Sequence, residues 1–231
     1  MISLRDTANC HDVKGSFHVV RDFFGYATGA PQPLSLARQL ELVGGYHTHV
    51  NIIRVGADAF DADDDAEIDA AIAVMRGLFG AIDFGVVIGV RRDVSLDEAN
   101  GMEHVSNDSE AQALTEEFDV SLMYVDIFVV RTMAGPSVVI APVGGPVTRK
   151  GKLRGVVVAI ESSATTTGFA MARGVANYLG LGPRENSNNL MFATLPNGGN
   201  ITAHQAYLLK QNMFSWEGCG PHYWLRLSGG L

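Results

Sequence analysis

The chain has 231 residues, of which 47% are hydrophobic and 18% are charged, and this profile indicates a globular rather than a disordered protein. The formal net charge of −8 argues against a nucleic-acid-binding surface, because phosphate contacts need clustered Lys and Arg. No apolar stretch reaches the roughly 18 residues of a membrane span, and no signal-peptide pattern opens the chain, so we expect a cytoplasmic protein without a membrane segment.

The first predicted elements are a strand and an amphipathic helix. Residues 1–45 mix Gly, Pro and aromatic residues, with a short helical pattern over 34–42, and we treat them as an N-terminal extension or subdomain. Residues 46–55 alternate and are rich in β-branched side chains, which predicts a strand. Carboxylates at 61–65 then precede apolar residues at helical spacing, as the helix dipole favours. These apolar residues are Ile68, Ala71, Ile72, Met75 and Phe79.

Further strands alternate with helices along the rest of the chain. The apolar runs predict strands at 86–90, 125–131, 137–141 and 155–160, and helices at 109–117 and 168–179. The hydroxyl-rich residues 162–167 are expected to link strand and helix, and Thr202 to cap a last helix. This order predicts an α/β (α+β) fold with a smaller C-terminal subdomain.

Residues 169–183, FAMARGVANYLGLGP, are the most informative segment. They read as a helix that ends at Gly180 and the following Gly-Pro pair. The segment resembles the catalytic helix of the metzincin metalloproteases, whose pattern is H-E-x-x-H-x-x-G-x-x-H followed by a methionine turn. Residues 176–181, ANYLGL, differ in two letters from GHYLGL, a common ending of that helix.

Other pieces of the same family pattern follow in order. Residues 188–191, NNLM, resemble the methionine turn with its Met191, and residues 201–205 resemble the helix start after it. The resemblance covers about residues 46–215, including pieces at 126–130, 142–146 and 155–158. It implies a zincin-like mixed twisted sheet with a central former active-site helix. In this division residues 46–182 form the zincin-like subdomain, and residues 183–231 the smaller C-terminal one.

The resemblance fails at every position that would bind zinc or activate the zinc-bound water. With Gly180 on the motif's glycine, Arg173 and Asn177 replace the first two histidines, Gly174 replaces the glutamate and Pro183 replaces the third histidine. Zinc needs neutral imidazoles or anions as ligands, and hydrolysis needs a carboxylate beside the metal-bound water. Arginine is a permanent cation, while glycine and proline have no donor side chain. We therefore expect no zinc and no proteolysis.

Other sites have weaker support. His47 and His49 alternate in a predicted strand and share a face, but without a third ligand they do not specify a metal site. The acidic run at 61–65 lacks the glycine and closing glutamate of an EF-hand, and there is no G-x-S-x-G elbow. Whether Cys10 and Cys219 form a disulfide stays open.

Two functions remain. The first is a non-proteolytic pseudoenzyme that acts as a binding or assembly component, taking a protein or an extended peptide along a sheet edge, with no cofactor. Arg173 would then make a structural ion pair or anchor a partner's carboxylate. The alternative is a metal-independent enzyme with a small anionic substrate held by Arg173, Asn177, Glu185 and His204. The partner, a homo-oligomeric state and a place in a larger assembly all stay open.

Overall fold

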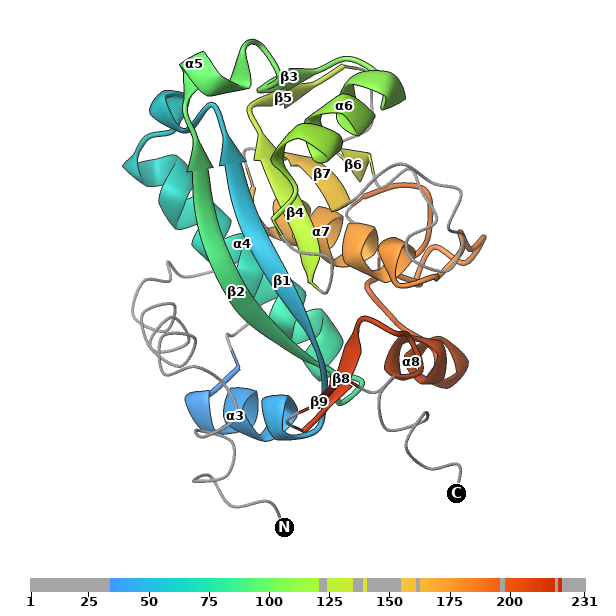
Figure 1. Cartoon of the computed structure of the whole chain (residues 1–231). Helices are drawn as coiled ribbons and strands as arrows, with labels where there is room; N and C mark the ends of the chain where they lie inside the picture. Colours follow the sequence, from blue (N-terminus) through green and yellow to red (C-terminus); the bar gives the residue numbers. More distant parts are fainter. Residues whose placement is uncertain are drawn as a thin grey trace, which may run out of the picture.

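A twisted sheet around one long central strand organises the described part of the chain (Figure 1). The computed structural model describes residues 34–120, 124–134, 139–140, 155–160, 163–195, 198–218 and 220–221. The elements in chain order are α3 (Leu36–Gly44), β1 (Tyr46–Val55), the 3-10 turn η1 (Ala57–Ala59), α4 (Ala62–Gly80), β2 (Gly85–Val94), α5 (Leu96–Ala99), β3 (His104–Val105), α6 (Asp108–Phe118), β4 (Val125–Val130), β5 (Thr132–Met133), β6 (Val139–Ile140), β7 (Gly155–Ala159), α7 (Ala164–Tyr178), α8 (Ala203–Lys210), β8 (Ser215–Glu217) and β9 (Gly220–Pro221).

The central strand β1 has neighbours on both sides. It pairs in parallel with β2 on one side and with β4 on the other. Beyond β4 come the parallel strand β7 and then β6, an antiparallel strand at the edge. The start of β1 also pairs antiparallel with β8, which returns from the C-terminal part of the chain. The sheet is mixed and mainly parallel, and the predicted α/β class is confirmed.

Helices cover both faces of this sheet. The helices α4 and α7 pack against each other on one face, and α6 lies on the other (Figure 1). Side chains of β1 alternate between the two resulting cores. Val50 and Ile52 belong to the core under α4 and α7, whereas Ile53 and Val55 belong to the core under α6. Burial on both faces explains why these strands are apolar almost throughout.

The helix α7 lies unusually close to α4. A Cβ atom added at Gly168 would come within 2.5 Å of Val74 Cβ and 2.6 Å of the Ala71 carbonyl oxygen. Glycine is therefore needed where the two helices touch. The contact fixes the position of α7, the helix that carries Arg173, Gly174 and Asn177.

Most predicted elements are confirmed, with shifts at their ends. The strand β1 has the predicted bounds, and α4 begins where the acidic run predicted a helix start, with Asp61 and Asp64 forming a capping box. Thr202 caps α8 as expected, with Gln205 completing a second capping box. The strands β3, β5, β8 and β9 were not predicted, because two or three residues are too few to show a hydrophobic period.

The expectation that residues 162–167 are a linker is wrong for the threonines. The helix α7 begins at Ala164 and includes them. The buried Thr167 hydroxyl donates to Glu67 Oε1 of α4 at 3.0 Å, so a contact between helices outweighs the preference of threonine for other conformations. The 142–146 piece, the two cysteines and part of the predicted 137–141 strand lie outside the described residues.

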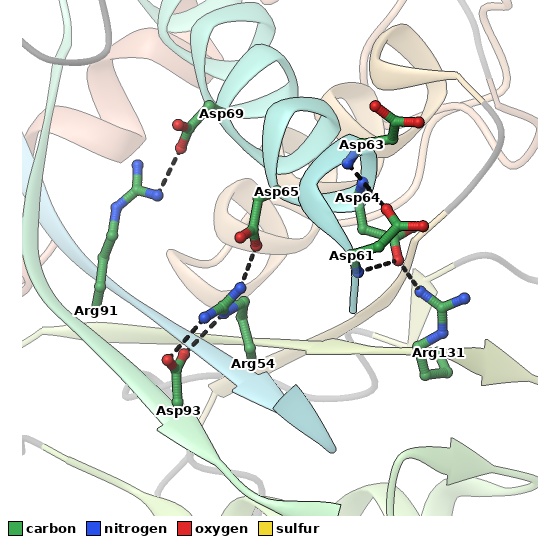
Figure 2. A network of polar contacts seen from close by, with 9 residues as sticks. All are labelled: Arg54, Asp61, Asp63, Asp64, Asp65, Asp69, Arg91, Asp93 and Arg131. Carbon is green, nitrogen blue, oxygen red and sulfur yellow. Dashed lines mark hydrogen bonds and ion pairs between the residues drawn. The ribbon is translucent and has the colours of Figure 1, made fainter. Parts of the chain in front are cut away.

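Ion pairs hold the N-terminal half of α4 against the sheet (Figure 2). Arg54 of β1 donates from Nε and Nη2 to the two carboxylate oxygens of Asp93 on β2, both at 2.7 Å, and from Nη1 to Asp65 of α4. Arg91 of β2 forms an ion pair through Nη1 with Asp69 of α4, which also links the sheet to the helix. A cavity of about 240 Å³ lies among these side chains, lined also by Ile52 and Ile68. The hydrogen bonds from Arg54 lower the pKa of the Asp93 carboxyl below its usual range.

Replacing Arg54 with methionine should therefore reduce stability in a pH-dependent way. The depressed pKa of Asp93 means that the ion pair stabilises the fold above about pH 4 and that this contribution disappears as the pH falls further. Asp65 and Asp93 are more than half exposed and can be hydrated when Arg54 is absent. We expect R54M to lower the free energy of unfolding by about 1 kcal/mol at pH 7.

Urea unfolding of R54M and wild type at pH 7 and pH 3 measures this effect. The difference between the two proteins should shrink at pH 3. A difference that stays constant between the two pH values would contradict the assigned role of Asp93.

Candidate functional site

The chain reverses at the C-terminal end of α7, where the motif's glycine was placed. Gly180 has a φ of 98°, a conformation that favours glycine, and its N–H donates to the Asn177 carbonyl oxygen. The Leu181 N–H donates to the Ala176 carbonyl oxygen at 2.9 Å. These two bonds form a Schellman motif, which terminates the helix and turns the chain back. The predicted stop at Gly180 is confirmed.

Arg173 and Asn177 lie one turn apart on α7, as their spacing requires. Arg173 Nη1 donates to the Ala193 carbonyl oxygen at 2.7 Å, and Asn177 Nδ2 donates to the Leu181 carbonyl oxygen at 3.0 Å. Both side chains are half-buried. They donate hydrogen bonds to the backbone of the segment that follows the helix. A metal ion needs electron pairs from its ligands, and these two nitrogen groups offer it none.

Gly174 lies on the side of α7 that faces the sheet. A Cβ atom added there would lie 2.2 Å from Val156 Cγ1 of β7, closer than any real contact. In this packing, no side chain fits at the position where the family pattern has its glutamate. The backbone contact that seats α7 on β7 therefore excludes a carboxylate at this position.

The four former zinc positions do not fit a zinc ion. Pro183 is exposed and has no donor atom in its side chain, and the other three positions are occupied as just described. Elsewhere within the described ranges, no three His, Cys, Asp or Glu side chains converge in a way that could hold a metal.

Met191 is buried beneath the reversal, with 1% of its surface exposed. Its N–H donates to Asn189 Oδ1 at 3.0 Å, and its carbonyl oxygen accepts from the Arg184 N–H. Asn189 and Gln205 exchange two amide hydrogen bonds, at 2.8 and 3.1 Å. This buried amide pair ties the methionine segment to the start of α8. The pair could not be predicted from the sequence, because its members are 16 residues apart in different elements.

Glu185 and His204, the other two residues expected to contact a small substrate, make no polar contact with Arg173 or Asn177 in the described structure. Glu185 and His204 are both exposed. Within the described residues, no hydrogen bond or ion pair connects either of them to Arg173 or Asn177. The four residues proposed for a small-substrate site are thus not linked into one polar network.

His47 and His49 do share a face, and they lie in an aromatic cluster. Their ring centroids are 5.1 Å apart, and both residues are buried. His49 stacks on Tyr124 at 4.6 Å and lies 4.7 Å from Trp216. By the alternation of β1 they are on the same face as Ile53, opposite to α7.

A buried carboxylate that the sequence analysis did not single out lies on that same face. Asp126 of β4 accepts from Asn51 Nδ2 at 2.6 Å and from the Val120 N–H at 2.8 Å, and Asn51 Oδ1 accepts from the Val90 N–H. In the sequence, the sign that could have pointed to this residue is an aspartate within an otherwise apolar strand. Its bonds join β1, β2, β4 and the end of α6, so we interpret it as a structural network.

Among the comparisons with known proteins, the search of solved structures found similar chains. No family model and no curated protein matches the chain. Metalloproteinase-II from Bacteroides fragilis is 11% identical with a TM-score of 0.49, over 85% of this chain and 60% of that protein. Archaemetzincin from Methanopyrus kandleri is 12% identical with a TM-score of 0.48, over 72% of this chain and 95% of that one. The chain thus spans less than two thirds of the Bacteroides protein.

No helix in the described ranges is long and apolar enough to cross a membrane.

The contact at Gly174 can be tested by adding one methyl group. G174A should lower the free energy of unfolding by about 1–3 kcal/mol, because Val156 and the helix must move apart. Gly182 is the matched control, since an added Cβ meets nothing within 4 Å and its φ is not positive. G182A should change stability by less than about 0.5 kcal/mol. Equal effects of the two substitutions in urea unfolding would contradict the close packing of α7 on β7.

Proposed function

We propose that this chain is a non-proteolytic, metzincin-like binding or assembly component that recognises an extended peptide or a protein segment. The observation that carries the first half of this proposal is the contact between Gly174 and Val156. It leaves no space for the general base that peptide hydrolysis requires, and Arg173 and Asn177 use their polar groups on the neighbouring backbone.

The edge strand β6 supports the binding half. It is antiparallel to β7 through the pairs Val139–Val158 and Ile140–Val157, and it ends the sheet on this side among the described strands. Such an edge presents backbone N–H and C=O groups that an extended peptide can pair with. The helix α7 contacts both β7 and β6, so the former zinc helix lies next to this edge. Binding of this kind needs no metal.

A metal-independent enzyme is less well supported. Acid–base chemistry needs a proton acceptor within hydrogen-bond reach of the bound substrate. Glu185 and His204 are the candidates in this region, and both are exposed without a bond to Arg173 or Asn177 in the described structure. We therefore assign recognition rather than a reaction to this end of α7.

Two measurements test the loss of activity. The purified protein should release no soluble fragments from casein, and EDTA should leave its melting temperature unchanged, because no metal contributes to the fold. Casein cleavage that EDTA abolishes, or a melting temperature that EDTA lowers by several degrees, would contradict the proposal.

Peptide display tests the proposed binding of an extended peptide. Selection of displayed random heptapeptides against the immobilised protein should enrich sequences that also bind as synthetic peptides in solution. Amide hydrogen exchange of the complex should show added protection at Val139–Ile140, where a new strand would pair. Enriched peptides that protect only other parts of the chain would contradict binding at this edge.

A further inference from the structure

Arg173 is the only charged residue of α7, and it is half-buried at the former zinc position. Within the described residues it makes one hydrogen bond, from Nη1 to the Ala193 carbonyl oxygen. A guanidinium group has five N–H donors in a planar fork, so this bond occupies a small part of its capacity. The rest of the fork is suited to an acceptor that the described residues do not provide.

The charge of Arg173 has no counter-charge in the described part of the chain. Arg76 and Arg92 also donate to backbone carbonyl oxygens, those of Val86 and Phe118. Four other arginines face carboxylates: Arg38 faces Glu41 and Asp83, Arg54 faces Asp65 and Asp93, Arg91 faces Asp69, and Arg131 faces Asp64. Arg173 faces a backbone carbonyl group instead. Burial lowers the pKa of Arg173, and no carboxylate raises it again. A partly desolvated cation without an opposite charge is unfavourable in the free protein and favours an incoming anion.

Few charged residues accompany Arg173 in this part of the chain. Over residues 163–195 the only charged side chains are Arg173, Arg184 and Glu185, whereas the whole chain has a net charge of −8. The backbone of Arg184 bonds to Met191, two residues before the Ala193 carbonyl oxygen that Arg173 contacts. Within this stretch an anion bound to Arg173 would meet one carboxylate, the exposed Glu185.

We infer that Arg173 is the anchor for a carboxylate of the bound peptide, supplied by an Asp or Glu side chain or by the peptide's C-terminus. The inference rests on the proposed binding function and adds the chemistry of the ligand. Guanidinium and carboxylate groups match as parallel forks and form two charge-assisted hydrogen bonds. The contact of α7 with β6 favours a peptide over a free anion, because a strand paired to that edge runs beside the helix.

Three matched pentapeptide libraries test this assignment. All are N-acetylated and randomised over the same uncharged residues at four positions. The first has a central Glu and an amidated end, the second a central Gln and an amidated end, and the third a central Gln and a free C-terminal carboxylate. Binding to the wild-type chain should be about tenfold stronger for the first or third library than for the second, and which of them binds distinguishes the two carboxylate sources.

Two variants show whether Arg173 causes the difference. R173Q removes the charge and keeps a polar amide at the end of a shorter side chain, so it should bind all three libraries equally weakly. R38Q removes an arginine at the other end of the sheet, on α3, and should retain the wild-type preference. The melting temperature of R173Q verifies that the variant is folded. The side-chain Nε–Hε resonance of Arg173 should shift on titration with the preferred library.

The outcomes separate this inference from the proposed function. Equal binding of all three libraries to the wild-type chain would overturn the carboxylate anchor and leave peptide recognition standing. Absence of binding by every library would overturn both. A shift of the Arg173 resonance with succinate as large as with peptide would overturn the peptide as the source of the carboxylate. Retention of the preference in folded R173Q would remove Arg173 from the site.

Discussion

The contact between Gly174 of α7 and Val156 of β7 sets the arrangement on which the rest of the site depends. With no Cβ at Gly174, the helix lies directly on the strand, and Gly168 brings it equally close to α4. Seated in this way, α7 turns Arg173 and Asn177 toward the segment that follows it. The same contact leaves no space for a side chain at position 174. One packing constraint thus fixes the helix and keeps this position a glycine.

Polar bonds hold the segment that follows α7. Arg173 bonds to Ala193, Asn177 to Leu181, and the buried pair Asn189–Gln205 joins the methionine segment to α8. The bond within the buried pair Asn189–Gln205 satisfies amide groups that would be costly to bury alone. Within the described residues no carboxylate balances the charge of Arg173, and for that reason we place recognition there.

The sequence predicted regular elements well and tertiary contacts poorly, for physical reasons. Tyr46–Val55 has a clear period and β-branched residues, and Thr202 and Asp61 have the side chains of N-caps, so local patterns sufficed. Thr165–167 was misread because the bond from Thr167 to Glu67 spans 100 residues. The departures at Arg173, Gly174, Asn177 and Pro183 were visible in the letters alone. The close approach behind Gly174, and the lack of a carboxylate beside Arg173 among the described residues, could be seen only from neighbours in three dimensions.

The most direct measurement of the central claim is the zinc content of the untagged protein, purified from cells grown with added zinc and analysed by elemental mass spectrometry. The side chains at the former zinc positions lead us to expect far less than one zinc ion per chain, and the same low content in R173Q. One zinc ion per chain, retained through gel filtration, would contradict the account.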